Sequence, residues 1–207
     1  MKIEMFFDCS SPWSYLAFER IQPLADSFEL PIEWHPVLAG GIFNAVNPGI
    51  EWNKSRDKIP PRKIDYHFKV MQDWADITSI EIKFPPKGHP VNSVKAMRAC
   101  LVLQPLDKMI PFARACFQAY FAKELPLSED AVLLNICRAT GVDGEWLLER
   151  ITQQDAKDAL RAKVDEAIAR GAFGVPTIYL NGTDMYFGVD SLPLVAARLE
   201  RWRTETS

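Results

Sequence analysis

The chain has 207 residues, of which 48% are hydrophobic and 25% are charged, and its formal net charge is −3. This composition is typical of a globular protein with one domain, or with one domain that carries a large insertion. The charge balance and the scattered Lys and Arg residues argue against a nucleic-acid partner. No apolar stretch reaches the roughly 18–20 residues of a membrane span, and the chain starts with strand-like sequence instead of a signal region. We therefore expect no membrane partner and a cytoplasmic location.

The first part of the chain predicts a strand–helix–strand unit. Residues 2–8 alternate loosely as in a strand, and residues 12–28 have helical spacing with proline at the first position. Residues 32–38 predict a second strand, ended by Gly40 and Gly41. Two strands joined by one helix pack as a parallel pair, so we expect a crossover unit here.

The middle of the chain is predicted to be mostly helical. Residues 44–62 are rich in Asn, Pro and charge and predict a long loop, after which helical spacing returns over residues 62–75. Three prolines exclude a helix over residues 83–90. Apolar residues then recur at three- and four-residue spacing in five further segments: 92–103, 108–122, 128–140, 143–151 and 155–170.

Strand signals return near the C-terminus. The segment Gly174-Val175-Pro176-Thr177 opens a strand, Asn181-Gly182 predicts a hairpin turn, and residues 185–188 form the returning strand before a helix over residues 192–202. The two ends of the chain can therefore complete one sheet. The predicted domains are a discontinuous sheet-containing domain and an inserted helical domain, with these boundaries: residues 1–50 with 171–207, and residues 51–170.

The cysteines and histidines form no metal or disulfide pattern. Cys9 follows the first strand and can be a reactive thiol or a core thiol; strand alternation would point it to the same side as Phe7 and Ser11. The other cysteines lie in apolar helical segments, which indicates buried free thiols: Cys100, Cys116 and Cys137. The histidines lack metal-ligand spacing, so no metal site is expected: His35, His67 and His89.

The residues that carry chemistry gather after the first strand. Residues 8–14 read Asp-Cys-Ser-Ser-Pro-Trp-Ser, the layout of a thioredoxin-type active site in which serine, at Ser11 and Ser14, occupies both redox positions. Disulfide exchange is therefore excluded. Ser11 can be a plain helix N-cap, or it can hold a thiolate that another molecule supplies. The pair Val175-Pro176 favours the second interpretation, because a thioredoxin-type site requires a strand that starts with proline.

These motifs resemble the DsbA-like branch of the thioredoxin superfamily, and within it the group of 2-hydroxychromene-2-carboxylate isomerases and kappa-class glutathione transferases. The resemblance covers nearly the whole chain and implies an α/β, thioredoxin-like fold of the DsbA/kappa-GST type with an inserted all-helical domain. Four segments carry it: residues 8–17, 61–66, 83–93 and 171–177.

The resemblance also implies a glutathione site. The serine that matches Ser11 hydrogen-bonds the glutathione sulfur, beside the start of a helix at Pro12 and Trp13. The pair that matches Val175 and Pro176 binds the cysteinyl backbone, with the proline cis.

The other implied contacts have competing interpretations. Asn53 and Lys63 match residues near the tripeptide or the substrate, but Asn53 can be a turn residue and Lys63 can lie on a solvated helix face. In the turn that holds the γ-glutamyl end, Asp190 is kept and Ser191 replaces the usual arginine, which predicts weaker anchoring. Three tryptophans can line a flat aromatic pocket or pack in the core: Trp13, Trp52 and Trp74.

The leading functional prediction is a glutathione-dependent isomerase. It would convert 2-hydroxychromene-2-carboxylate, or a related aromatic catabolite, to trans-o-hydroxybenzylidenepyruvate by reversible thiolate addition, with glutathione as cofactor. A kappa-class-like glutathione transferase is the first alternative, and a non-catalytic peptide-binding module that uses the Val175-Pro176 edge is the second. The expected partners are glutathione and a small aromatic substrate, and the resemblance implies a homodimer.

Overall fold

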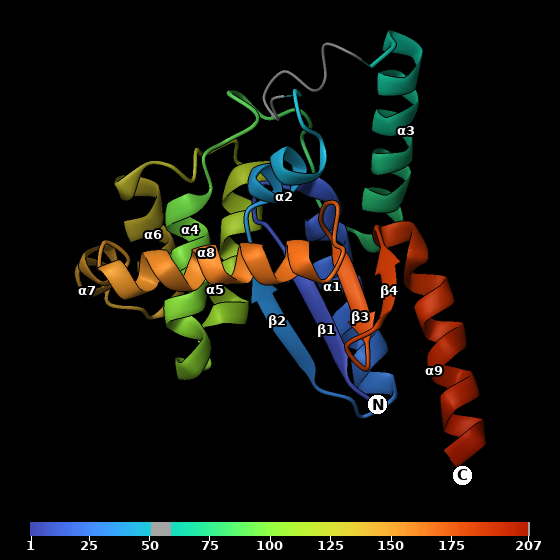
Figure 1. Cartoon of the computed structure of the whole chain (residues 1–207). Coiled ribbons are helices and arrows are strands. Elements are labelled where there is room, and N and C mark those ends of the chain that lie inside the picture. Colours follow the sequence, from blue (N-terminus) through green and yellow to red (C-terminus); the bar gives the residue numbers. More distant parts are fainter. Residues whose placement is uncertain (51–58, 207) are drawn as a thin grey trace.

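The computed structural model describes residues 1–50 and 59–206, and this part of the chain forms a four-stranded sheet flanked by helices (Figure 1). The strand order is β2-β1-β3-β4; β1 pairs in parallel with β2, and the other two pairings are antiparallel. The predicted crossover unit and C-terminal hairpin are confirmed, and they meet in one sheet. The strands are β1 (Ile3–Phe7), β2 (Ile32–Pro36), β3 (Thr177–Leu180) and β4 (Asp184–Phe187).

Helices make up most of the remaining described chain. In chain order they are α1 (Pro12–Ser27), α2 (Ala39–Val46), α3 (Pro61–Thr78), α4 (Val94–Leu103), α5 (Met109–Phe117), α6 (Asp130–Thr140), α7 (Gly144–Arg150), α8 (Gln154–Ala169) and α9 (Leu192–Thr206). A π-helical turn, Gln118–Ala122, extends α5, and two short 3₁₀ turns span Gln104–Leu106 and Val189–Ser191. None of the helices in the described chain combines the length and the apolar character of a membrane span.

The central strand β1 is buried on both faces. Ile3, Met5 and Phe7 pack into the larger core with side chains of α1, α4 and α5. Phe6 points to the opposite face and packs into a smaller core with α2 and α8. Figure 1 shows α8 crossing one face of the sheet while α1 lies behind it. The alternation of a strand therefore places helices on both faces, and the inserted helices share the larger core with the sheet. The predicted domain boundaries stay a prediction.

Helix α2 corrects two predictions. The sequence predicts that Gly40 and Gly41 end the second strand and that residues 44–62 form a loop. The first is wrong, because β2 ends at Pro36 and both glycines lie inside α2. The second is wrong at its ends, because residues 44–46 belong to α2 and residues 61–62 to α3, and its middle, residues 51–58, lies outside the described residues.

The physical reason lies in two contacts from distant parts of the chain. The Asp8 carboxylate accepts a hydrogen bond from the amide of Ala39 at 2.8 Å and so caps the start of α2. At Gly41, a Cβ atom would lie 3.2 Å from Val164 Cγ1 of α8. Glycine here allows close packing of α2 against α8.

Candidate functional site

A pocket of about 540 Å³ opens where β1 ends and α1 begins. Four segments that are distant in sequence line it: the start of α1, helix α2, the loop before β3, and the end of β4. We call it the α1 pocket. It brings together three of the predicted site residues, Ser11, Trp13 and Val175, and adds Phe43, Phe173 and Phe187.

Ser11 is the N-cap residue of α1, and Pro12 occupies the first helical position as predicted. The Ser11 hydroxyl oxygen accepts a hydrogen bond from the Ser14 amide at 3.2 Å. A hydroxyl can accept and donate at the same time. No acceptor for the Ser11 hydroxyl hydrogen occurs in residues 1–50 or 59–206, so it is available to a ligand in the α1 pocket. Capping and ligand binding are therefore compatible.

Asp8 is a residue of the site that the sequence interpretation missed. Its carboxylate is only 1% exposed and accepts hydrogen bonds from the amides of Ser10 and Ala39, each at 2.8 Å. One side chain thus connects the start of α1 to the start of α2, which are two walls of the α1 pocket. Burial raises the pKa of the Asp8 carboxyl, and the amides of Ser10 and Ala39 oppose that rise. The signal that could have found it is the Asp-x-Ser spacing of an Asx turn directly after a strand.

The opposite wall of the pocket comes from the segment before β3. The Val175–Pro176 peptide is cis, as the resemblance implies. Beside it, the rings of Phe173 and Phe187 pack with centroids 4.5 Å apart. A Cβ atom at Gly174 would lie 3.0 Å from Cε2 of Phe187, so glycine allows this ring to lie against the backbone next to Val175.

A second pocket of about 320 Å³ adjoins the first, and the two share Trp13 and Phe187. We call it the Asp190 pocket. The Asp190 carboxylate accepts a hydrogen bond from Trp74 Nε1 at 2.5 Å. Trp74 therefore fixes Asp190 at this pocket, and the Arg20 guanidinium lies 4.5 Å from the Trp74 ring centroid. Ser191 lines neither pocket: it is buried and its hydroxyl donates to the Gly188 carbonyl at 2.7 Å.

Three other predicted residues contribute no described side chain to these pockets. Lys63 is exposed in the first turn of α3 and lines neither pocket. Its neighbour on that helix, Tyr66, does line the Asp190 pocket. Asn53 and Trp52 lie outside the described residues.

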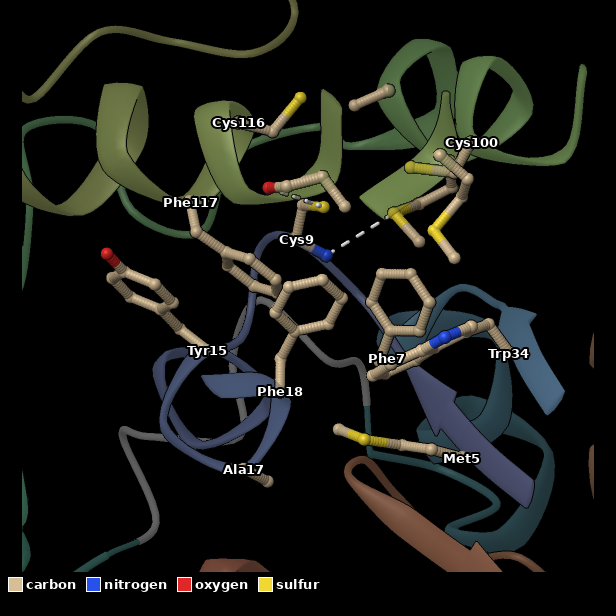
Figure 2. Packing of buried hydrophobic residues seen from close by; sticks show 14 of the residues in the cluster. Met5, Phe7, Cys9, Tyr15, Ala17, Phe18, Trp34, Cys100, Cys116 and Phe117 are labelled. Atoms are coloured by element: carbon tan, nitrogen blue, oxygen red, sulfur yellow. Dashed lines mark hydrogen bonds between the residues drawn. The ribbon is translucent and has the colours of Figure 1, made fainter. Parts of the chain in front are cut away.

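The structure assigns Cys9 to the core. Figure 2 shows its side chain among Phe7, Cys100 and Cys116, and it is fully buried. Burial raises the pKa of the Cys9 thiol well above its ordinary value, so the thiol is the stable and unreactive form. The amide of Cys9 donates to Met97 Sδ at 3.3 Å, which fixes the turn after β1.

A polar cluster lies on the other face of the sheet and is not part of either pocket. His35 Nε2 lies 3.4 Å from Glu4 Oε1 and 3.3 Å from Glu33 Oε1. The Lys163 ammonium, which can only donate, lies 3.1 Å from His35 Nδ1. Nε2 of the neutral ring therefore carries the hydrogen and offers no lone pair to a metal. Arg170 pairs with the same Glu4 carboxylate, at 2.9 Å, so this cluster is a charge-balanced ion-pair network.

Comparison with known protein families assigns this architecture to a family. A family model described as a DSBA-like thioredoxin domain matches residues 2–200. The chain belongs to this family. In this chain the α1 pocket opens at the strand–turn–helix junction between β1 and α1, where Ser11 is the N-cap residue.

Individual relatives support the same assignment. A glutathione S-transferase kappa 2 of Caenorhabditis elegans is 27% identical over 206 residues, covering 94% of this chain and 89% of the relative. A 2-hydroxychromene-2-carboxylate isomerase of Pseudomonas sp. (strain C18) is 25% identical over 190 residues, covering 92% of this chain and 86% of the relative. A solved structure of a 2-hydroxychromene-2-carboxylate isomerase has a TM-score of 0.85 at 23% identity and covers 100% of both chains. The predicted thioredoxin-like, DsbA-type fold is confirmed.

Proposed function

We propose that this DSBA-like protein is a glutathione-dependent isomerase that acts on a conjugated aromatic substrate of the kind named for its relatives. The observation that carries the proposal is the meeting of Ser11, at the start of α1, with Val175 in one pocket. A hydroxyl donor and a backbone segment that can pair with a peptide are what a bound cysteinyl residue requires. The Asp190 pocket, which adjoins it across Trp13 and Phe187, supplies a carboxylate for an ammonium group.

The residues fit glutathione in three places. Ser11 would donate its free hydroxyl hydrogen to the sulfur, the backbone at Val175 would pair with the cysteinyl unit, and Asp190 would accept from the γ-glutamyl ammonium. Ser191, whose hydroxyl already donates to Gly188, offers no free hydrogen to the γ-glutamyl carboxylate. Weak anchoring of that carboxylate stays our prediction.

The start of α1 can favour a thiolate at neutral pH. An ordinary cysteine thiol has a pKa of about 8.5, so it is mostly protonated. The positive end of a helix contributes about 0.3–2 kcal/mol, and a hydrogen bond to a charged group contributes about 1.5–3 kcal/mol. Together they correspond to a lowering of the thiol pKa by roughly one to four units, since one unit is about 1.4 kcal/mol.

Glutathione would supply a nucleophile whose reversible addition to a conjugated double bond permits rotation about that bond. The protein's own contribution is to orient the sulfur with Ser11, to fix the tripeptide along Val175, and to exclude water with the apolar walls of the α1 pocket. A glutathione transferase is the second candidate, because relatives with that name cover nearly the whole chain.

The first experiment measures binding and ionisation. Glutathione should bind wild-type protein in a calorimetric titration, and the ultraviolet absorbance of the thiolate should show a lowered thiol pKa in the complex. In Ser11→Ala the pKa of the bound thiol should rise by at least about one unit. Ser27→Ala, at the C-terminal end of the same helix, is the matched control and should behave as wild type. An unchanged pKa in Ser11→Ala would leave Ser11 with the capping role alone.

The second experiment separates the two candidate reactions. An isomerase releases every glutathione molecule after each turnover, whereas a transferase consumes one for each product. Chromatographic measurement of free glutathione during turnover of an isomerisable substrate decides between them. Stoichiometric loss of glutathione would contradict the isomerase proposal and favour the transferase.

A further inference from the structure

We infer that a separate cleft along α1 binds a small organic molecule that carries one carboxylate. The cleft has a volume of about 560 Å³, and its described lining shares no residue with the α1 pocket or the Asp190 pocket. We call it the Tyr15 cleft. It lies between α1, the segment that follows α3, and the π-helical turn after α5. The inference does not rest on the proposed glutathione function.

Tyr15 provides the first observation. It is only 4% exposed, and its ring stacks on that of Phe117 with the centroids 4.8 Å apart and the planes 6° apart. Figure 2 shows the hydroxyl at the end of the ring that points away from Phe7. Tyr15 lines the cleft, and its hydroxyl has no hydrogen-bond partner in the part of the chain that the structure describes. A hydroxyl buried to this extent without a partner in the fold indicates that its partner comes from the cleft.

The groups around this hydroxyl make it a donor. Burial, and then the Glu19 carboxylate, raise the pKa of Tyr15 to about 12, so the hydroxyl keeps its hydrogen at neutral pH. Both oxygens of Glu19 already accept from Arg114 Nε, at 2.8 and 3.0 Å. Arg114 Nη2 donates to Gln22 Oε1 at 2.9 Å, and no acceptor for Nη1 occurs among residues 1–50 and 59–206. Tyr15 and Arg114 therefore bring two free donors to the lining of one cleft.

The balance of charge favours one negative group in the ligand. The Glu19 carboxylate is paired with Arg114. Glu81 is paired with Lys83, whose ammonium lies 3.3 Å from Glu81 Oε1. Lys123 also lines the cleft, and its ammonium has no ion pair or hydrogen bond with the rest of the described chain, so one positive charge is left over. A carboxylate can accept from ammonium, guanidinium and hydroxyl groups alike, whereas a doubly charged phosphate would meet two acidic side chains.

The size and the wall of the cleft require a body on this carboxylate. A carboxylate group alone would fill a small part of about 560 Å³. Ile80 and Ala122 add apolar groups to the lining beside the polar ones. Small-molecule sites combine apolar walls with a few placed polar groups in this way. The ligand is therefore a small organic acid and not an inorganic anion.

The test uses benzoate and butyrate, with benzamide and butyramide as uncharged counterparts, in titrations of wild-type protein followed by nuclear magnetic resonance. At least one carboxylate should bind with a dissociation constant of about 10 mM or less, and at least about tenfold more tightly than its amide. Equal binding of acid and amide, or no binding of either acid, would overturn the inference and leave water as the partner of the Tyr15 hydroxyl. Inorganic phosphate is a further arm, and tighter binding of phosphate than of both carboxylates would also overturn it.

Variants locate the carboxylate in the Tyr15 cleft. Tyr15→Phe keeps the ring and removes the hydroxyl, so the affinity for the carboxylate should fall about tenfold or more. Lys123→Gln should weaken binding by about two- to fivefold, because this charge is exposed, and Lys157→Gln, exposed on α8 and outside the cleft, is the matched control. Ser11→Ala alters the α1 pocket and should bind the carboxylate as wild type does. If Tyr15→Phe and Lys123→Gln both keep wild-type affinity, or if Ser11→Ala loses it, the carboxylate lies elsewhere and the inference is wrong.

Discussion

Asp8 provides the sharpest test of how the site is held together. Its buried carboxylate accepts from the amides of Ser10 and Ala39, each at 2.8 Å. In Asp8→Asn, one of these amides faces an NH₂ group in place of an oxygen. A hydrogen bond to a charged group contributes about 1.5–3 kcal/mol, and removal of a buried charge offsets part of this. We expect the free energy of unfolding to fall by about 1–3 kcal/mol.

Urea denaturation followed by circular dichroism measures this change. Asp26→Asn on the exposed surface of α1 is the matched control and should change stability by less than about 0.5 kcal/mol. Glutathione affinity should also fall in Asp8→Asn, because the starts of α1 and α2 are no longer fixed to one side chain. A loss of stability no larger than that of the control would refute the argument that Asp8 connects the two helices.

The pH dependence gives an independent check on Asp8. Burial raises the pKa of this carboxyl in the folded protein, so the folded state binds the proton more tightly than the unfolded state. The contribution of Asp8 to stability is then fully present below the ordinary Asp pKa of about 3.9 and decreases as the pH rises through the raised value. The stability difference between wild type and Asp8→Asn should therefore widen on acidification. A difference that narrows would show that the carboxylate is favoured in the folded state.

Three further predictions concern other residues. Burial, and then the charge of Lys163, lower the pKa of His35, so the contribution of His35 to stability is present above about pH 6.5 and is lost as the pH falls through the lowered pKa. His35→Gln should therefore make the free energy of unfolding, measured by denaturation, depend less steeply on pH. An equally steep dependence in the variant would exclude His35 as its source. Ser11→Cys should attack glutathione disulfide, bind one glutathione and release the other, while mass spectrometry finds the buried Cys9 unmodified; modification of Cys9 would contradict its place in the core. Asp190→Asn should weaken glutathione binding about tenfold in calorimetry, because a charged acceptor for the ammonium is lost, and an unchanged affinity would place the γ-glutamyl group elsewhere.

The sheet could be predicted from the sequence because its signals are local. Alternation in β1, helical spacing after Pro12 and the Asn181-Gly182 turn each lie within one segment of the chain, and all three appear in the structure. Helix α2 could not be predicted in the same way. Its Gly-Gly sequence disfavours a helix locally, and its cap comes from Asp8, which is 31 positions away. Tertiary contacts thus decide this element.

The side-chain direction of Cys9 is a second feature that the sequence pattern does not predict. Alternation predicts that Cys9 and Ser11 point to the same side, but alternation applies only while the backbone is extended. The amide of Ser11 donates to the carbonyl of Asp8 at 3.0 Å, so the chain already turns over residues 8–11. Cys9 therefore enters the core while Ser11 lines the pocket. The direction of a side chain within a turn depends on hydrogen bonds that the sequence alone does not specify.

The two interpretations of Ser11 that the sequence left open describe one geometry. As N-cap, the hydroxyl oxygen accepts from the Ser14 amide, and this bond holds the side chain at the start of α1. The same bond leaves the hydroxyl hydrogen able to donate to a ligand, in the place where the helix dipole favours an anion. A cysteine at this position would bring its own thiolate, whereas under the proposed function serine provides the site and glutathione brings the thiolate. If the proposed function holds, serine in place of cysteine changes the source of the nucleophile and keeps the site that stabilises it.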